Sequence, residues 1–173
     1  MKSLLVLLSF VCGVTLNAQK WYVDHNEEMQ FWGNITIQSL KKAPHGDWFN
    51  ASYEDYSPEK NVVVSESFKD VEVLVFMGTW CSDSHEWVPR LVKLWEANGL
   101  STANLFLTGL HNRKDLYKQS PGRSELNYGI ERVPTFIFLR DGVEIGRITE
   151  TPTNSLEEDV AHIAFDNLEV PHN

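Results

Sequence analysis

The stretch at residues 73–89, which reads VLVFMGTWCSDSHEWVP, most constrains what this chain can fold into. Its first five residues form an apolar run, rich in β-branched and aromatic side chains, that is typical of a buried strand. From Ser82 onward the apolar residues recur at helical spacing, which predicts a helix whose apolar face carries Trp87, Leu91, Leu94 and Trp95. Cys81 therefore lies where a buried strand gives way to a helix.

This position makes Cys81 a candidate reactive thiol. Backbone N–H groups at a helix start have no partner within the helix, and the helix dipole is positive there. Both effects favour the negatively charged thiolate, which is the nucleophilic form of cysteine. The alternative is a buried structural cysteine, because a free thiol behaves as a small hydrophobic group. The polar neighbours Ser82, Asp83 and Ser84 favour the accessible, reactive thiol.

Residues 1–18 are typical of a secretory signal peptide. Lys2 supplies the positive start, residues 4–14 the apolar centre, and Leu16-Asn17-Ala18 a cleavage site. We therefore expect export, to a bacterial periplasm or out of the cell. A retained or lipidated N-terminus at Cys12 is the alternative. Cleavage after residue 18 leaves Cys81 as the sole cysteine, so an internal disulfide is impossible.

Composition narrows the classes of partner. The formal net charge of -9 is spread along the chain, which argues against nucleic acid or anionic lipid as a partner. A hydrophobic content of 42% suits one domain with a sizeable core. We expect a monomer with no bound cofactor and no membrane association once residues 1–18 are removed.

Residues 19–60 are expected to form an N-terminal extension, helical or irregular, that packs on the domain. The apolar mixture in Trp21–Lys42 predicts an amphipathic helix. Trp48–Ser57 is aromatic and acidic without a clear period, which indicates a surface segment or, alternatively, a wall facing a substrate. Asn61–Phe68 is interpreted as a short edge strand or the lead into the central strand.

Residues 61–173 predict an α/β domain, a small mixed sheet flanked by helices. The Cys81 helix ends near Asn98-Gly99. After it, the pattern predicts a second buried strand at residues 103–110, a short helix capped by Ser124 at residues 124–130 and a third strand at residues 133–139. A hairpin turn at residues 141–142, a returning strand at residues 143–148 and a closing helix at residues 156–168 complete the domain. Thr153-Asn154-Ser155 would cap the last helix.

This order resembles the thioredoxin-like superfamily over about residues 61–168. The resemblance rests on the strand–Trp-Cys–helix unit, the Val133-Pro134-Thr135 strand entrance and the Asp141-Gly142 hairpin. It implies a thioredoxin fold, with Cys81 as the nucleophilic cysteine and Pro134 as a cis-proline beside it. The segments GTWCSDSHEWVP and PTFIFLRDG also resemble bacterial exported thioredoxin-family proteins with a Trp-Cys-x-Asp-Ser motif.

Two departures from that family matter. Its motif is Cys-x-x-Cys, whereas this chain places Ser84 where the resolving cysteine would stand, and Val75 where many members carry a buried acid. A serine hydroxyl cannot close a disulfide. We therefore predict single-thiol exchange, either isomerisation or reduction of mixed disulfides, that uses an external thiol. The partners would be exported proteins with disulfides or a small-molecule thiol, and whether the chain is an enzyme stays open.

Two further catalytic candidates follow Cys81 on the predicted helix. Ser84 could donate a hydrogen bond to the thiolate, or serve only as a polar helix-start residue. His85 lies four residues after Cys81, so both side chains could share one helix face. It could stabilise the thiolate as an imidazolium, accept a proton as a neutral base, or be a solvated surface histidine.

Four residues are candidates for substrate binding. The backbone of Val133 would lie beside Cys81 if Pro134 is cis, and it could then pair with an extended substrate. Arg132 could attract an anionic thiol partner, or form a surface salt bridge. Trp80 could shield the thiol or line a peptide groove, and the competing role is packing in the core.

Two other classes of function stay open. One is a non-catalytic binding module that keeps the groove for exported polypeptides. The other is copper or zinc handling, with Cys81 and His85 as ligands at helical spacing and His111 joining from a loop. Two ligands at this spacing are a weak signal, so the sequence predicts no metal site.

Overall fold

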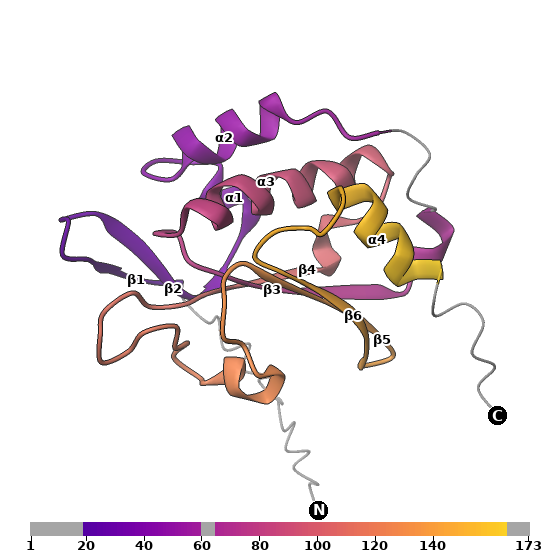
Figure 1. The fold of residues 1–173 in the computed structure, drawn as a ribbon. Coiled ribbons are helices and arrows are strands. Elements are labelled where there is room, and N and C mark those ends of the chain that lie inside the picture. The colour runs from indigo at the N-terminus through magenta and orange to yellow at the C-terminus, as the bar shows by residue number, and fades with distance from the viewer. Residues whose placement is uncertain (1–18, 60–64, 166–173) are drawn as a thin grey trace, which may run out of the picture.

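A six-stranded mixed sheet organises the structure (Figure 1). The computed structural model describes residues 19–59 and 65–165, and its strands lie in the order β1-β2-β4-β3-β5-β6. Strands β3 and β4 are parallel and the other neighbours are antiparallel. The strand bounds are Lys20–Val23, Met29–Ile35, Val71–Met77, Leu105–Gly109, Thr135–Arg140 and Val143–Thr149 for β1 to β6. The expected α/β class and thioredoxin arrangement are confirmed.

In the described part of the chain, the longer helices lie over one face of this sheet. Figure 1 shows α2 (Gly46–Asp55), α3 (Ser82–Ala97) and α4 (Leu156–Phe165) on the same side. The long connection between β4 and β5, which contains the 3-10 turn η3 (Ser124–Tyr128), crosses the opposite side. The two faces therefore carry two separate hydrophobic clusters.

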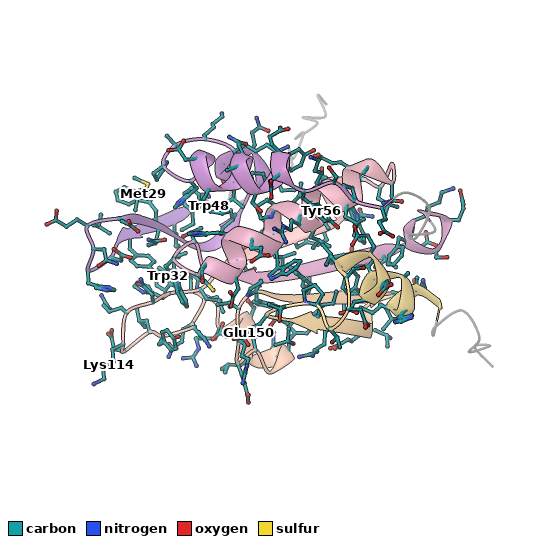
Figure 2. The ribbon with its side chains drawn as sticks, turned by 45° about the horizontal axis from the view of Figure 1, so that its top comes forward. Met29, Trp32, Trp48, Tyr56, Lys114 and Glu150 are labelled. Atoms are coloured by element: carbon teal, nitrogen blue, oxygen red, sulfur yellow. The ribbon has the colours of Figure 1, made fainter. Side chains whose placement is uncertain are left out.

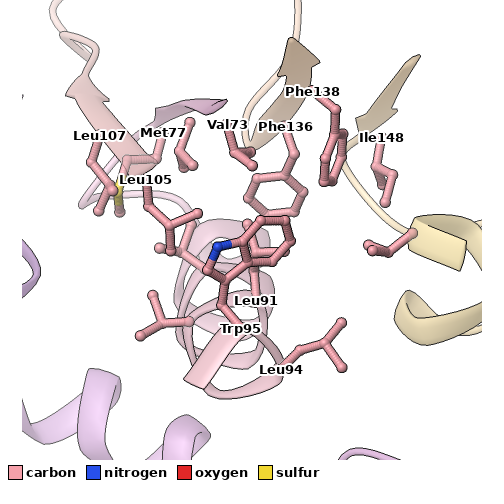
Figure 3. Packing of buried hydrophobic residues seen from close by; sticks show 14 of the residues in the cluster. Val73, Met77, Leu91, Leu94, Trp95, Leu105, Leu107, Phe136, Phe138 and Ile148 are labelled. Atoms are coloured by element: carbon pink, nitrogen blue, oxygen red, sulfur yellow. The ribbon is translucent and has the colours of Figure 1, made fainter. Parts of the chain in front are cut away.

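The larger cluster, here the helix-face cluster, is centred on Trp95. Its indole is fully buried and packs edge-on against Phe68, 5.3 Å between ring centroids. Figure 3 shows it among side chains of the central strands and of α3, including Val73, Leu91, Leu105, Phe136 and Phe138. Alternate residues of β3 point into this cluster, as the apolar pattern of that strand predicts.

The smaller cluster, here the loop-face cluster, lies on the opposite side of the sheet. Its buried members are Phe76, Leu110, Val133, Ile137 and Leu139. Trp80 and Cys81 pack against it, together with Tyr128 and Ile130 from the covering connection. The candidate thiol thus belongs to the thinner side of the molecule.

The amphipathic helix expected at Trp21–Lys42 is wrong. The segment forms a hairpin of β1 and β2, followed by the single turn α1 (Ile37–Leu40). Within β2 the buried residues Phe31, Gly33 and Ile35 alternate with more exposed ones, which is a strand period. The hairpin turn is held by Asp24, whose Oδ1 accepts the N–H groups of Asn26 and Glu28 at 2.9 and 3.1 Å.

The segment Trp48–Ser57, expected to lie at the surface without a clear period, mostly belongs to α2. Its rings pack on the domain as expected, because Trp48, Tyr53 and Tyr56 lie against the helix-face cluster. Phe49 is fully buried, and the Ser52 hydroxyl donates to the Glu86 carbonyl of α3 at 2.9 Å. A helical spacing is present in this segment, at Phe49, Ser52, Tyr53 and Tyr56. The many aromatic and acidic side chains around it make this spacing hard to recognise in the sequence. Of the strand expected at Asn61–Phe68, residues 61–64 lie outside the described residues, and Ser65–Phe68 is a 3-10 turn (η1).

The C-terminal half follows the sequence-based expectation closely. Asp141 and Gly142 both have positive φ, 52° and 76°, as the two-residue hairpin between β5 and β6 requires. The Ser155 hydroxyl accepts the Glu158 N–H at 3.1 Å and caps α4. The cap expected at Ser124 is wrong, because Arg123 occupies the N-cap of η3 and makes no side-chain cap bond.

The expected signal peptide, residues 1–18, lies outside the described residues. Within the part of the chain that the structure describes, no helix has the length and apolar character needed to cross a bilayer.

Candidate active site at Cys81

Cys81 occupies the N-cap of α3, with extended backbone angles of φ -101° and ψ 123°. The usual cap is a hydroxyl or carboxylate that bonds to the first amides, whereas Cys81 makes no side-chain cap bond. The side chain is half-buried, and among the described residues it is the one free cysteine. Its thiol is therefore beside the positive end of a sixteen-residue helix.

The thiol contacts the entrance of β5. Its Sγ donates to the Val133 carbonyl at 3.3 Å, across 52 residues of sequence. This carbonyl belongs to the peptide bond between Val133 and Pro134, which is cis. Val133 and Pro134 themselves are buried. The structure thus brings together the two sequence-predicted features, the cysteine and the proline strand entrance.

Trp80 lies against the loop-face cluster. Its indole Nε1 donates to the Leu110 carbonyl at 2.8 Å, and its ring lies 5.7 Å from that of Tyr117. The ring also lies over Gly78, where a Cβ atom would come within 2.5 Å of the indole. Trp80 is half-buried, and it packs against the same cluster as Cys81.

The Ser84 side chain is hydrogen-bonded to the backbone of the turn that precedes α3. It is fully buried, and its hydroxyl accepts the Gly78 N–H at 3.2 Å. This bond uses only an acceptor site of the hydroxyl, so the hydrogen bond from Ser84 to the Cys81 thiolate stays a prediction. The position expected for a buried acid, Val75, is buried in the helix-face cluster.

His85 points toward the turn that precedes Cys81. Its Nε2 donates to the Thr79 carbonyl at 2.6 Å, and its ring stacks on Trp48 with 4.2 Å between centroids. Figure 2 shows Trp48 in the space between α2 and α3. Burial lowers the pKa of His85, although the Thr79 carbonyl and the Glu28 charge act in the opposite direction. A neutral His85 therefore supports the turn.

Arg132 is at the surface beside the site. Its guanidinium pairs with Glu150 at 2.6 Å, and its side chain is 62% exposed. The hydrogen bond that Arg132 donates to the Glu150 carboxylate raises the pKa of Arg132, so the guanidinium stays charged. This is the contact expected of a surface salt bridge.

The histidines named as possible metal ligands have other partners. The His111 ring stacks on Tyr22 with 3.5 Å between centroids, and its Nδ1 accepts the Arg113 N–H at 3.0 Å. Because His85 is bound to Thr79, the pair of Cys81 and His85 is not assembled as a ligand set. Within residues 19–59 and 65–165, no three His, Cys, Asp or Glu side chains are grouped to hold a metal ion.

Sequence reasoning missed Gln30 and Thr79 as supports of the site, and it considered Trp48 only as a surface ring or as part of a wall facing a substrate. Trp48 stacks on His85, and the Thr79 hydroxyl donates to the Gln30 side-chain oxygen at 2.7 Å across 49 residues. A polar pair so far apart in sequence leaves no local pattern. For Trp48, the helical spacing of its neighbours in α2 was the available signal.

Comparison with known proteins finds no matching family model and no match among curated proteins. Among solved structures, a protein of unknown function from Pseudomonas aeruginosa is 15% identical, with a TM-score of 0.49, over 77% of this chain and 89% of that one. Fasciola hepatica thioredoxin is 20% identical, with a TM-score of 0.34, over 49% and 72%. Thioredoxin O2 from Arabidopsis thaliana is 15% identical, with a TM-score of 0.34, over 58% and 73%. Likenesses of this size say nothing about activity, and the fold assignment rests on the strand order and on the junction at Cys81.

Proposed function

We propose that this protein is exported and carries out thiol–disulfide exchange with Cys81 as its single nucleophile. One observation carries the proposal, namely a half-buried thiol at the N-terminus of α3 whose Sγ lies 3.3 Å from the Val133 carbonyl. The helix start favours the thiolate, and the open side of Cys81 leaves room for a partner sulfur. Residues 1–18, with their charged start and apolar centre, support export.

The exchange proceeds in two balanced steps. The Cys81 thiolate attacks one sulfur of a substrate disulfide, a mixed disulfide forms, and the other substrate sulfur leaves as a thiolate. A second thiolate, from the same polypeptide or from a small molecule, then attacks the substrate sulfur and releases Cys81. The number of disulfides is unchanged, so no further oxidant or reductant is required. Ser84 cannot perform the second step, because it carries no sulfur.

The test is the reaction of the folded protein with oxidised glutathione, followed by intact-mass measurement, with Cys81→Ala as the control. We expect one glutathione adduct on the wild-type chain, its removal by added thiol, and no adduct on the variant. Iodoacetamide should likewise alkylate the folded wild-type chain at Cys81 and leave the variant unmodified. A wild-type thiol that reacts only after unfolding would rule out the exchange function.

A non-catalytic binding module is the second candidate, and a specific contact favours it. The thiol donates its hydrogen to a backbone carbonyl, a weak hydrogen bond that the neutral thiol makes and the thiolate cannot. Cys81 would then be a structural part of a peptide groove. Unfolded exported polypeptides that bind equally well to wild type and Cys81→Ala, without a covalent adduct on either, would decide for this candidate.

Export has its own test. Expression in a bacterial host followed by cell fractionation should recover a mature chain whose N-terminal residue is Gln19. An uncleaved chain in the cytoplasm would overturn the localisation and leave the thiol chemistry to be judged separately.

A further inference from the structure

The turn that presents Cys81, residues 78–81, is held through Thr79. The Thr79 side chain is only 2% exposed, and both its hydroxyl and its carbonyl are hydrogen-bonded to groups from other elements. The Cys81 N–H bonds back to the Gly78 carbonyl at 3.0 Å, so the turn is closed around Thr79. Any shift of Thr79 is therefore transmitted to the cysteine two residues later.

The Thr79 hydroxyl is fixed by β2. It donates to Gln30 Oε1 at 2.7 Å and accepts the Phe31 N–H at 3.0 Å. Both partners are buried, with Gln30 1% exposed and Phe31 7% exposed. A buried polar group that loses its partner is costly, so these three groups hold one another in place.

The orientation of the Gln30 side-chain amide is set by a hydrogen bond from its nitrogen. Its Nε2 donates to Asp24 Oδ2 at 3.1 Å, which directs Oε1 toward the Thr79 hydroxyl. The same Asp24 oxygen accepts a hydrogen bond from Asn112, just after β4, at 3.0 Å. The hairpin of β1 and β2 and the end of β4 therefore meet in one hydrogen-bonded network that ends at the reactive turn.

The Thr79 carbonyl is fixed from the helical side. His85 in α3 donates to it at 2.6 Å, and Trp48 of α2 stacks on the His85 ring. The turn is thus held by hydrogen bonds to β2 on one side and to His85 of α3 on the other, with Trp48 of α2 packed on His85. Residues 19–59 supply two of these three supports.

We propose that Thr79 and Gln30 are positioning residues for the Cys81 nucleophile, and that the β1–β2 hairpin is consequently part of the reactive site. This inference rests on the proposed exchange function. The Thr79 hydroxyl bonds to Gln30 and the Phe31 N–H, and Gln30 bonds on to Asp24, so both side chains act on the cysteine through the backbone of the turn. A displacement of even about 1 Å in a reacting group can reduce a rate severalfold to a hundredfold.

The test measures the second-order rate constant of Cys81 with 2-hydroxyethyl disulfide, a small neutral probe, from pH 5 to pH 9. Thr79→Val keeps the shape of the side chain and removes the hydroxyl, so Gln30 Oε1 and the Phe31 N–H lose their partner. We expect the rate constant to fall about tenfold and the midpoint of its pH profile to move. Thr79→Ser, which restores the hydroxyl, should recover the wild-type profile to within about twofold.

A matched control separates positioning from general loss of stability. Ser120 is equally buried, and its hydroxyl also both donates and accepts, toward Glu125 and the Ser124 N–H. Ser120→Ala should lower the melting temperature about as much as Thr79→Val and leave the rate constant and its pH profile unchanged.

Gln30→Met tests the same hydrogen bond from its other end, including the case in which Thr79→Val does not fold. The rate constant should fall in the same direction, and the double variant should react no more slowly than the slower single variant, because both remove one contact. A Thr79→Val protein that reacts like wild type while its melting temperature falls would overturn the positioning role alone. A wild-type thiol that does not react at all would overturn the exchange function as well, so the two failures are distinguishable.

Discussion

The two faces of the sheet differ in what they contribute. The helix-face cluster is large and holds most of the fully buried side chains, with Trp95 at its centre. The loop-face cluster has five buried members and is covered by the connection between β4 and β5 rather than by a long helix. Trp80 and Cys81 pack on this second, thinner cluster.

This division explains how a thiol can be both held and accessible. The turn that carries Cys81 is anchored on the helical side by His85 and on the strand side by Gln30, through Thr79. Toward the loop face, Cys81 packs on the smaller cluster and its Sγ donates a hydrogen bond to the Val133 carbonyl. The proposed exchange function needs this combination, because a nucleophile that forms and releases a bond to an outside sulfur must be both positioned and accessible.

The largest expected effect is on the helix face. Trp95→Ala removes the largest fully buried side chain, and we expect it to lower the free energy of unfolding by about 3–5 kcal/mol. Urea titration measures this change. Trp21→Ala is the matched control, because Trp21 is 57% exposed and its loss should change stability by less than about 0.5 kcal/mol. Equal losses for both variants would contradict the placement of the core.

Acid should weaken the same face. Burial, with a smaller contribution from the His85 charge, lowers the pKa of His45 to about 4, against 6.5 in the unfolded chain. Between these values the unfolded state binds the proton and the folded state does not, so stability is complete above pH 6.5 and is lost as pH falls toward 4. The loss should reach about 2–3 kcal/mol.

Urea titrations from pH 7 to pH 4 check this dependence. His45→Phe should reduce the pH dependence, because it removes one titrating group, while the part that comes from the lowered pKa of His85 remains. His162→Gln, at an exposed site on α4, should leave the dependence as in wild type. A stability that does not change with pH in the wild-type chain would show that His45 is not held neutral by burial.

The next effect compares equal substitutions on the two faces. Ile137→Val on the loop face and Ile148→Val on the helix face each remove one buried methylene, and each should cost about 1 kcal/mol. Because Ile137 shares its cluster with Cys81, only Ile137→Val should change the alkylation rate of the thiol, by about twofold. Identical alkylation rates for the two variants would mean that the loop-face cluster does not influence the thiol.

The smallest effect is expected at Arg132. Its exposed pair with Glu150 is screened by water, so Arg132→Ala should leave the unfolding transition unchanged within error. The same variant decides whether Arg132 attracts anionic partners. A slower reaction with oxidised glutathione, but not with neutral 2-hydroxyethyl disulfide, would assign it that role, and equal rates would leave it as a surface salt bridge.

The sequence was most informative where one local pattern determines the structure. The apolar run of β3, the helical spacing after Ser82 and the Asp141-Gly142 turn each depend on neighbouring residues, and the structure follows all three. The apolar side chains of Trp21–Lys42 fitted a helix about as well as a strand. What decides for the strand is the pairing of β2 with β4, including the Gly33 position opposite Gly109.

The residues that support the Cys81 turn could not be predicted from local sequence patterns. Cys81 and the Val133-Pro134 entrance were identified because their motifs are contiguous, although they meet only in the fold. Gln30 and Thr79 are ordinary polar residues in sequence, and their roles arise from a hydrogen bond between elements that are far apart along the chain. His85 was chosen for its spacing from Cys81, but a spacing of four does not fix which way the ring turns, and Thr79 and Trp48 decide it.

Ser84 has a consequence for any attempt to engineer a dithiol. Its hydroxyl is fully buried and accepts the Gly78 N–H, so the position already has a task in the backbone of the turn. Sulfur is larger than oxygen and a weaker hydrogen-bond acceptor. Ser84→Cys would therefore install the second sulfur and loosen the turn that carries the first, so a working two-cysteine version of this protein requires a compensating change near Gly78.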